Sequence, residues 1–250
     1  MTPRVAVCWD VDGTLLHGGT VGREVLAAAF TEVTGHPAPI DRIAMGGRTD
    51  WLIGEALRDA LAAEHAAAIT ARGDDFGHAM VAAVTATWER RADDLVAVAR
   101  TLPGVRETVA ALAAEPGVVQ TLTTGNVPAG ARAKLTAVGL ADSPIDLDLG
   151  GYGVGPGARV RVVTAARDAL AARYGTAPAL VVVGDTPLDV EAAHRAGAVA
   201  VGVATGRSST DELHAAGAEH VFADLADPAR LVAVVRSARE DSWHTTRGGS

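Results

Sequence analysis

Cysteine and lysine are almost absent from this sequence. The 250 residues include one cysteine, Cys8, so no disulfide can form within the chain, and a reducing cytoplasm is the expected compartment. Cys8 lies inside a short apolar run, which favours a side chain that fills the core over a nucleophile. The one lysine, Lys134, leaves a single position at which a lysine-dependent mechanism could operate.

The sequence also lacks a long apolar run and a cluster of basic residues. Residues 1–4 lead directly into a short apolar segment, so we expect a soluble, unprocessed chain with neither a signal peptide nor a membrane span. The 30 acidic and 22 basic residues give a net charge of -8. This charge argues against nucleic acid or an anionic membrane as the main partner. An anionic substrate would need a metal ion or local arginines to offset it.

The composition is that of a chain with a substantial core. Hydrophobic residues make up 48% of the sequence, enough for one large domain or two modest ones. Short valine-rich runs recur, each followed by a helical pattern, which is typical of βαβ units. The runs are residues 5–9, 118–123, 179–183 and 198–203, with weaker candidates at 145–149 and 220–222. We predict an α/β fold with a doubly wound, mostly parallel sheet covered by helices on both faces.

A long helical insert separates the first two predicted strands. Helical patterns cover residues 23–34, 50–61 and the alanine-rich segment 66–98, which we expect to be broken near Gly73, and no convincing strand interrupts them. Gly18-Gly19 and Pro103-Gly104 flank the insert as hinges or as turns that do not move. The predicted organisation is a core of residues 1–15 and 102–240, an inserted helical domain of residues 16–101, and a disordered tail at 241–250.

Two carboxylates follow the first predicted strand. Asp10 and Asp12 occur in Asp10-Val11-Asp12-Gly13-Thr14-Leu15, at the end of the apolar run. Ligands bind beyond the carboxyl ends of strands in open α/β sheets, so this pair is expected where substrate and metal arrive. The alternative is that the Asp-Gly pair only ends the strand in a turn.

Two further strand ends carry polar residues. Thr124-Gly125-Asn126 offers a hydroxyl and backbone N–H groups before a helix, which suits phosphate oxygens or helix capping. Asp185 and Asp189 follow the strand at 179–183. If that strand neighbours the first, Asp10, Asp12 and Asp185 converge, and their repulsion calls for a divalent cation such as Mg²⁺. Asp189 fits a residue that orients the site or caps a helix.

In this order, and with the continuation at 190–206, the motifs resemble those of the haloacid dehalogenase superfamily, whose members are mostly phosphatases. The resemblance spans nearly the whole chain. It implies a Rossmann-like core with a helical cap, as in the phosphoglycolate phosphatase and β-phosphoglucomutase branch. It also implies a Mg²⁺-dependent phosphatase that acts on a small-molecule phosphate monoester, phosphoglycolate-like or a sugar phosphate.

The resemblance also assigns roles to the motif residues. Asp10 would be the nucleophile that forms an aspartyl-phosphate, and Asp12 the general acid and then the general base. Asp10 and Asp185 would bind Mg²⁺ with their side chains, and Asp12 with its backbone carbonyl. The phosphoryl group would be bound by Thr124 and by the backbone of Gly125 and Asn126.

The third motif of the superfamily is normally a lysine, and here the sequence departs from the pattern. Arg159 is our first choice, because a helix at 162–174 starts just after it, and Arg161 is the second. An arginine can do the same electrostatic work with a bidentate grip on phosphate. Lys134 is the third option, but we expect it to face solvent or to snorkel.

The insert resembles the helical cap that closes over the site in the phosphoglycolate phosphatase-like branch. Residues 45–50 resemble the cap loop that contacts substrate, so Arg48 is the candidate for recognising an anion on the leaving group. Alternatively, Thr49 or Asp50 only caps the next helix. His17, just after the first motif, is more typical of a hinge than of a catalyst.

Other functions fit parts of the pattern. A phosphomutase of the β-phosphoglucomutase type keeps the same aspartates and Mg²⁺, and a catalytically silent binding module could keep the fold. A 2-haloacid dehalogenase does not need Asp12, and a phosphonatase needs a cap lysine that the insert lacks. The expected partner is a small-molecule phosphate ester, with no nucleic acid and no membrane, and the expected state is a monomer or homodimer.

Overall fold

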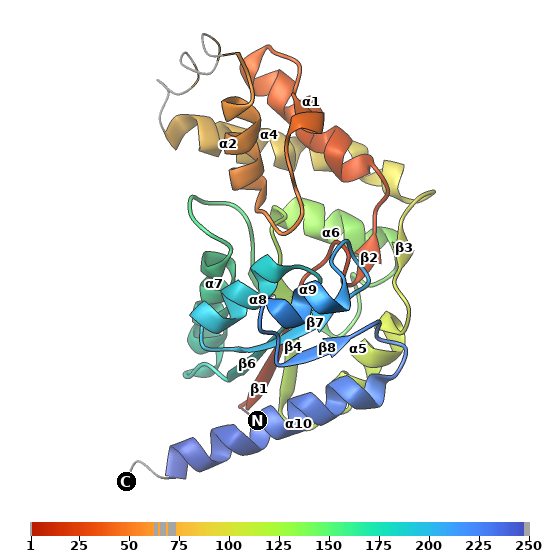
Figure 1. Ribbon diagram of the computed structural model, residues 1–250, viewed down its shortest axis with the longest axis vertical. Coiled ribbons are helices and arrows are strands. Elements are labelled where there is room, and N and C mark those ends of the chain that lie inside the picture. The colour runs from red at the N-terminus through yellow and green to blue at the C-terminus, as the bar shows by residue number, and fades with distance from the viewer. Residues whose placement is uncertain (1, 63–64, 66–68, 70–73, 248–250) are drawn as a thin grey trace.

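A six-stranded parallel sheet forms the centre of the protein (Figure 1). This computed structural model describes residues 2–247 apart from 63, 64, 66–68 and 70–73. The strands lie in the order β5-β4-β1-β6-β7-β8, and every pairing between them is parallel. Their bounds are β1 Val5–Trp9, β4 Val118–Thr123, β5 Ile145–Gly151, β6 Ala179–Gly184, β7 Val199–Val203 and β8 His220–Phe222. The predicted α/β fold with a doubly wound parallel sheet is confirmed.

Helices cover both faces of the sheet, which explains why its strands are continuous apolar runs rather than alternating ones. In β1, Val5, Val7 and Trp9 belong to one buried cluster, and Ala6 and Cys8 to the cluster on the opposite face. The first face packs against α5 (Val105–Ala113), α6 (Pro128–Ala137) and α10 (Pro228–Arg247). The second packs against α7 (Val160–Tyr174), α8 (Pro187–Arg195) and α9 (Thr210–Ala215).

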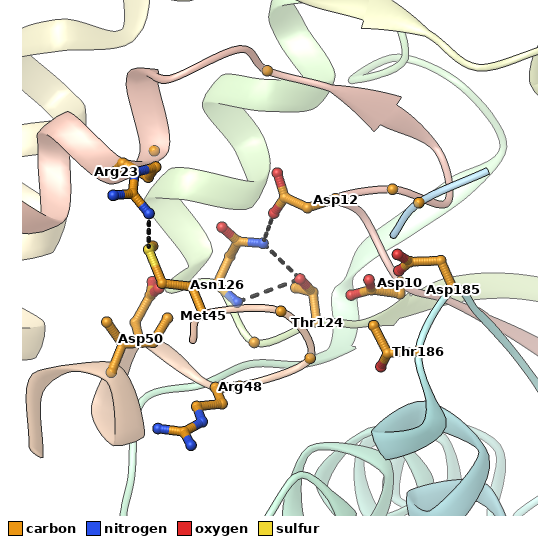
Figure 2. Close-up of a pocket in the computed structure, with 18 of the residues that line it drawn as sticks. Asp10, Asp12, Arg23, Met45, Arg48, Asp50, Thr124, Asn126, Asp185 and Thr186 are labelled. Atoms are coloured by element: carbon orange, nitrogen blue, oxygen red, sulfur yellow. Dashed lines mark hydrogen bonds between the residues drawn. The ribbon is translucent and has the colours of Figure 1, made fainter. Parts of the chain in front are cut away.

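The insert between β1 and β4 is helical, as predicted. It contains α1 (Val21–Thr34), α2 (Asp50–Asp59) and α4 (Asp74–Arg91), with short 3-10 turns at Ile40–Arg42 and Ala92–Leu95. In Figure 1 these helices lie beyond the carboxyl ends of the strands, and α10 lies at the other end of the sheet. The loop that carries Met45 and Arg48 lies opposite Asp10 and Asp185 (Figure 2). The predicted break near Gly73 lies outside the described residues.

The two crossings between sheet and insert are paired with each other. β2 (Leu16–His17) and β3 (Arg100–Thr101) form a two-stranded antiparallel ribbon, so the expectation of no strand in residues 16–101 was wrong. Two residues are too few for an alternating pattern to be visible in the sequence. Gly104, just after β3, has φ +72°, and a Cβ there would lie 1.9 Å from the backbone oxygen of Leu225. This close approach requires glycine.

The chain end also differs from the prediction. Helix α10 continues to Arg247, past residue 240, where we expected a disordered tail to start. Residues 229–247 contain neither proline nor glycine, so nothing in their backbone chemistry ends the helix. The last three residues of the predicted tail lie outside the described residues. None of the described helices combines the length and the apolar character that crossing a membrane would require.

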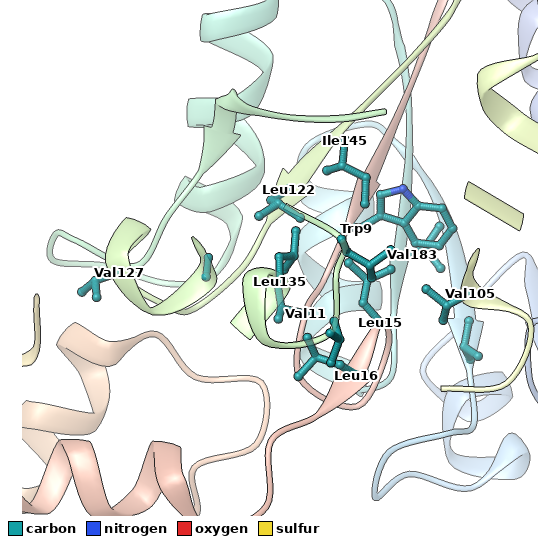
Figure 3. Close-up of a cluster of buried hydrophobic side chains, with 14 of the residues drawn as sticks. Trp9, Val11, Leu15, Leu16, Val105, Leu122, Val127, Leu135, Ile145 and Val183 are labelled. Carbon is teal, nitrogen blue, oxygen red and sulfur yellow. The ribbon is translucent and has the colours of Figure 1, made fainter. Parts of the chain in front are cut away.

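The larger of the two core clusters extends from one face of the sheet into the insert, and Figure 3 shows the part of it around the carboxyl ends of the central strands. Trp9 of β1, Leu122 of β4 and Val183 of β6 are all fully buried in it. The indole N–H of Trp9 donates to Gln120 Oε1 at 3.1 Å, and the Gln120 amide donates to the Val109 carbonyl at 2.9 Å. This core therefore fixes the strand ends from which polar residues emerge.

Leu122→Ala tests how much this core contributes to the stability of the protein. Removing a fully buried side chain leaves a cavity, so we expect the free energy of unfolding to fall by about 2–5 kcal/mol in a urea titration. Val96→Ala is the matched control, because Val96 is 66% exposed and its truncation should change stability by no more than about 0.5 kcal/mol. Equal losses in the two variants would contradict the assignment of Leu122 to the core.

Candidate active site

The pairing of β1 with β6 brings the acidic strand ends together. Trp9 lies opposite Val183 in the parallel register, and the backbone N–H of Asp10 donates to the Val183 carbonyl at 2.8 Å. Asp10 and Asp185 therefore leave neighbouring strands at the same edge, and their carboxylates lie close to each other (Figure 2). The sequence predicted this neighbourhood, and the register supplies its cause.

Asp10, Asp185 and Asp189 form a buried acidic group. One carboxylate oxygen from each lies within 4.8 Å of the others. Burial raises the pKa of Asp185 to about 8, and the charges of Asp10 and Asp189 add to the effect. Burial likewise raises the pKa of Asp10 to about 6, although Arg159 opposes the rise. Oδ1 of Asp185 is buried without a hydrogen-bond partner among the described residues. Oxygen ligands that repel one another fit a divalent cation. The side chain of Asp12 is not part of this group.

Two glycines hold backbone against the Asp185 carboxylate. A Cβ at Gly206 would lie 1.7 Å from Asp185 Oδ2, and one at Gly13, where φ is +86°, would lie 2.4 Å from the same atom. The Thr205 hydroxyl donates to the Gly13 carbonyl at 2.6 Å and ties the two segments together. A side chain at either glycine would displace the carboxylate.

Arg159 lies between two of these acids. It is 6% exposed, its Nη2 donates to Asp10 Oδ1 at 2.5 Å, and its Nε donates to Asp189 Oδ1 at 2.5 Å. Of the three basic candidates it is thus the one that contacts Asp10. A pocket lies between the insert and the strand ends, and Arg161 is exposed and does not line it. Helix α7 begins at Val160, directly after Arg159, so the start of the helix presents this side chain to the site.

Asp189 caps a helix and also contacts Arg159. Its Oδ2 accepts from the backbone N–H of Thr186 at 3.1 Å, and its own N–H donates to Thr186 Oγ1 at 3.4 Å, which completes a capping box at the start of α8. Its other oxygen accepts from Arg159. The two roles considered for this residue in the sequence are therefore compatible.

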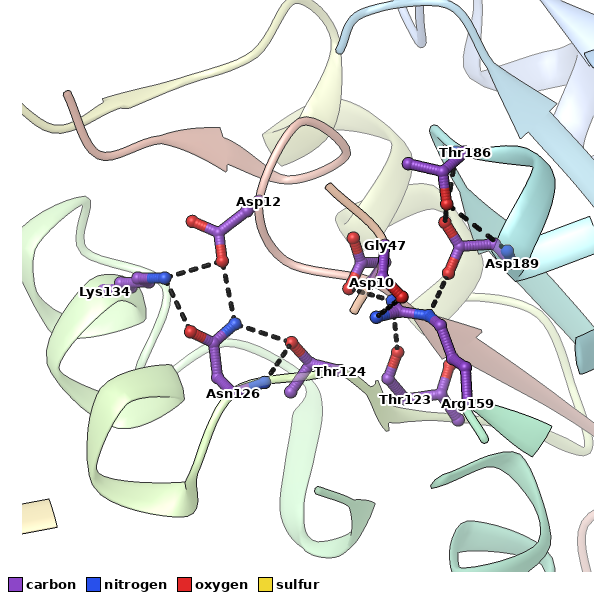
Figure 4. Close-up of polar contacts among 10 residues, drawn as sticks. All are labelled: Asp10, Asp12, Gly47, Thr123, Thr124, Asn126, Lys134, Arg159, Thr186 and Asp189. Carbon is purple, nitrogen blue, oxygen red and sulfur yellow. Dashed lines mark hydrogen bonds and ion pairs between the residues drawn. The ribbon is translucent and has the colours of Figure 1, made fainter. Parts of the chain in front are cut away.

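Asp12 lines the pocket (Figure 2), and Asn126 and Lys134 hold it from one side (Figure 4). Its side chain is 48% exposed. Oδ2 accepts from Asn126 Nδ2 at 2.8 Å and from Lys134 Nζ at 2.6 Å. The protein surroundings alone would raise the pKa of Asp12, but the Lys134 ammonium and the Asn126 amide hold it below its ordinary value.

Lys134 is buried, and the expectation that it faces solvent was wrong. It is 5% exposed, and its ammonium lies 5.3 Å from the centre of the Trp88 ring. The sequence did contain a signal. Lys134 stands three residues after Ala131 in α6 and four before the buried Val138 that follows the helix, so its spacing places it on the buried face with Ala131 and Leu135. The Asp12 carboxylate and the Asn126 amide oxygen both accept from its ammonium, and these bonds offset the cost of burying the charge.

Thr124 is fully buried at the end of β4 and lines the pocket. Its Oγ1 accepts from the Asn126 backbone N–H at 3.3 Å and from Asn126 Nδ2 at 2.7 Å, so the hydroxyl proton remains available to a ligand. The Asn126 N–H, predicted as a phosphate donor, is instead turned to Thr124. The Asn126 side chain, which the sequence offered only as a helix cap, does not cap α6 and instead donates to Asp12.

The first residue of α2 is bonded to the core. The backbone N–H of Asp50 donates to the Gly125 carbonyl at 2.7 Å, and Asp50 Oδ2 accepts from the Val127 N–H at 2.8 Å. Burial raises the pKa of Asp50 to about 6. Thr49 caps α2 by accepting from the Leu52 N–H at 3.2 Å, so the capping alternative for Thr49 holds. These contacts close the insert onto the strand ends.

A pocket of about 360 Å³ lies between the insert and the strand ends. The insert lines it with apolar side chains from Leu26, Ile43, Met45, Ile53 and Trp88. Arg48 also lines it, but the side chain is exposed, forms no hydrogen bond or ion pair with any described residue, and points away from Asp10 and Asp12 in Figure 2. His17 lines the pocket from β2.

Comparisons with known proteins agree with this architecture. The sequence profile of the haloacid dehalogenase-like hydrolases matches residues 5–197. A hydrolase from Pseudomonas syringae is similar in structure, with a TM-score of 0.62, 24% identity, and coverage of 93% of this chain and 99% of the other. A predicted phosphoglycolate phosphatase from Haemophilus somnus 129PT follows, with a TM-score of 0.61, 20% identity and coverage of 93% and 99%.

An archaeal beta-phosphoglucomutase from Pyrococcus sp. strain ST 04 is also similar, with a TM-score of 0.56, 17% identity and coverage of 93% and 99%. At these identities the solved structures establish a shared fold and no more. No curated protein matches the chain.

Asp185→Asn tests whether the acidic group is built for a cation. Because the pKa of Asp185 is raised to about 8 from an ordinary value of about 3.9, this group lowers the stability of the metal-free protein as the pH rises from about 4 to about 8. In chelator at pH 8, the variant should therefore unfold at a higher temperature than the wild type, with a gain on the order of 1–3 kcal/mol that shrinks at pH 5.

Adding Mg²⁺ should raise the melting temperature of the wild type and not that of Asp185→Asn. Asp142→Asn is the control, because Asp142 is exposed and does not line the pocket, so it should behave as the wild type in both solutions. An equal response of wild type and Asp185→Asn to Mg²⁺ would rule out Asp185 as a ligand.

Proposed function

The chain belongs to the haloacid dehalogenase-like hydrolases, and on this premise we propose that it hydrolyses a small-molecule phosphate monoester through an aspartyl-phosphate on Asp10. One observation supports the proposal above all. The Asp10 and Asp185 carboxylates lie close together beside Arg159, and Asp12 lines the same pocket. A nucleophile, a proton carrier and a cation site then share one edge of the sheet.

Mg²⁺ is the proposed cofactor. Asp10 and Asp185 would hold it with their carboxylates and Asp12 with its backbone carbonyl, and the unpartnered Oδ1 of Asp185 supports this set. When bound, the ion would neutralise charge on the phosphoryl group. A net charge of -8 makes such local positive charge necessary for an anionic substrate.

In the proposed reaction, the Asp10 carboxylate attacks phosphorus in line while the bond from phosphorus to the leaving oxygen breaks. The negative charge of a bound phosphate ester would raise the pKa of Asp12, which Lys134 and Asn126 hold low in the free protein, and Asp12 in its protonated form then gives a proton to the leaving oxygen. It then takes a proton from the water that attacks the aspartyl-phosphate, which restores Asp10 and releases inorganic phosphate. The exposed side of the Asp12 carboxyl group supports this role, because a proton carrier must reach the substrate.

The phosphoryl oxygens would be bound by the Thr124 hydroxyl, the backbone N–H of Gly125 and the Arg159 guanidinium. Thr124 retains a free proton to donate, and Arg159 already contacts the nucleophile. Fixed donors of this kind stabilise charge as it develops during phosphoryl transfer.

We further propose that residues 16–101 form a cap domain over a core of residues 1–15 and 102–240. The cap would exclude water while the aspartyl-phosphate forms, and Arg48 would meet an anionic group of the substrate. The bonds from Asp50 to Gly125 and Val127 support a closed arrangement. Phosphoglycolate-like esters and sugar phosphates are the proposed substrate class, and the names of two structurally similar proteins support it.

Phosphate release from a panel of esters tests the proposed function. We expect the wild type to release phosphate from p-nitrophenyl phosphate and from at least one ester among phosphoglycolate and common sugar phosphates, with Mg²⁺ and not with chelator. Asp10→Asn should release none while keeping the far-ultraviolet circular dichroism and the melting temperature of a folded protein. Asp142→Asn controls for loss of a surface charge and should keep full activity.

Undiminished release by Asp10→Asn would overturn the mechanism. Transfer of the phosphoryl group to a second sugar hydroxyl, with little transfer to water, would identify a mutase instead. Absence of turnover on every ester would leave a binding module with the same fold.

A further inference from the structure

We infer that Lys134 is a positioning residue that fixes the carboxyl group of Asp12 so that one oxygen, Oδ1, is presented to the leaving group. The inference rests on the proposed function, because it assigns the proton transfer to Asp12. It gives Lys134, the third option for the third motif, a different role, because Arg159 contacts Asp10 and Lys134 contacts Asp12.

Three side chains form a closed set of hydrogen bonds beside the pocket (Figure 4). Lys134 Nζ donates to Asp12 Oδ2 at 2.6 Å and to Asn126 Oδ1 at 2.6 Å. Asn126 Nδ2 in turn donates to the same Asp12 oxygen at 2.8 Å. Each side chain is therefore held by the other two, and a charge-assisted bond at this distance is strong and directional.

The two oxygens of Asp12 are in different positions. Oδ2 accepts both N–H donors, whereas Oδ1 accepts no hydrogen bond from any described residue. The Asp12 side chain is 48% exposed and lines the pocket. Because Oδ2 is occupied by two donors, a proton in transit is carried on Oδ1. Lys134 and Asn126 thus determine which oxygen of Asp12 carries the proton.

Lys134 can do this because the insert holds it in place. Its ammonium lies 3.7 Å from the position that a Cβ at Gly22 would occupy, and 5.3 Å from the centre of the Trp88 ring. A Cβ at Gly130 would lie 2.6 Å from Trp88 Nε1, so glycine there lets α4 and α6 approach closely. A lysine packed between helices loses the rotamer freedom that an exposed one keeps, which makes it a rigid anchor.

The alternative is that Lys134 serves only to neutralise charge in the fold. The two roles differ in their dependence on the leaving group. An alkoxide needs a proton to leave, whereas p-nitrophenolate leaves without one. Loss of a residue that positions the acid must slow alkyl esters more than p-nitrophenyl phosphate. Loss of structure, or of a direct contact with the phosphoryl group, slows both alike.

The experiment is a double-mutant cycle with Lys134→Met and Asp12→Ala. For each variant, kcat/KM is measured with Mg²⁺ on p-nitrophenyl phosphate and on the alkyl phosphate that the wild type hydrolyses best. This constant covers the steps through departure of the leaving group and leaves out the later hydrolysis of the aspartyl-phosphate. Circular dichroism and melting temperatures establish that each variant is folded.

With Asp12 present, Lys134→Met should lower the ratio of alkyl to aryl kcat/KM by at least about tenfold, because small misplacements of a catalytic group cost up to about a hundredfold. With Asp12→Ala, the same change should lower the ratio by less than about twofold, because no acid remains to be positioned. Lys134→Arg keeps a cation and donors, and should retain more of the ratio than Lys134→Met does.

A proportional loss on both esters, or the same loss with and without Asp12, would overturn the inference. If Lys134→Met does not fold, Lys134→Arg is measured in its place. An equal fall of kcat/KM on the alkyl and the aryl ester, with their ratio unchanged, would then overturn the inference. Failure of the wild type to hydrolyse any ester is a different result, because it refutes the proposed function and not the geometry around Asp12.

Discussion

Repulsion among carboxylates at one edge of the sheet is the constraint around which this site is built. Parallel pairing of β1 with β6 places Asp10 and Asp185 at adjacent strand ends, and Asp189 joins them with oxygens within 4.8 Å. Two unit charges at that separation repel by about 3 kcal/mol at an effective dielectric constant of 20. The Arg159 guanidinium, bonded to Asp10 and Asp189, offsets part of this repulsion, while Asp185 keeps an unpartnered oxygen.

The second carboxylate of the first motif is balanced separately. Asp12 pairs with Lys134, which comes from α6 and is covered by the insert. Each aspartate of this motif therefore has its own cation, Arg159 for Asp10 and Lys134 for Asp12. The division keeps the two acids in different surroundings, one buried and one facing the pocket, which suits groups with different chemical tasks.

The fold and the strand-end acids were accessible from the sequence because each has a local cause. Strands covered on both faces are continuous apolar runs, so residues 5–9 and 179–183 were visible, and Asp10 and Asp185 follow them directly. Arg159 was identified by its place just before α7. The ribbon of β2 and β3 was missed because two residues show no period.

Other features of the site depend on tertiary contacts that no local pattern encodes. The bond between Asp50 and Val127 joins residues 77 positions apart, and the one between Lys134 and Asp12 joins residues 122 apart. A lysine in a helix is usually exposed, so we predicted that Lys134 faces solvent, although its spacing matched that of the buried residues of α6. For Asn126, the sequence suggested a backbone contact with phosphate or a helix cap, whereas in the structure its side chain donates to Asp12.

The most direct test of the central claim is to look for a phosphoryl group on Asp10 during turnover. The wild type, mixed with Mg²⁺ and an ester that it hydrolyses, is quenched in acid within the first turnover, and its peptides are analysed by mass spectrometry. The account predicts a phosphoryl group on the peptide that contains Asp10, at this aspartate, and none in chelator or in Asp10→Asn. Phosphate release with no phosphoryl group on Asp10, or with one on another residue, would contradict it.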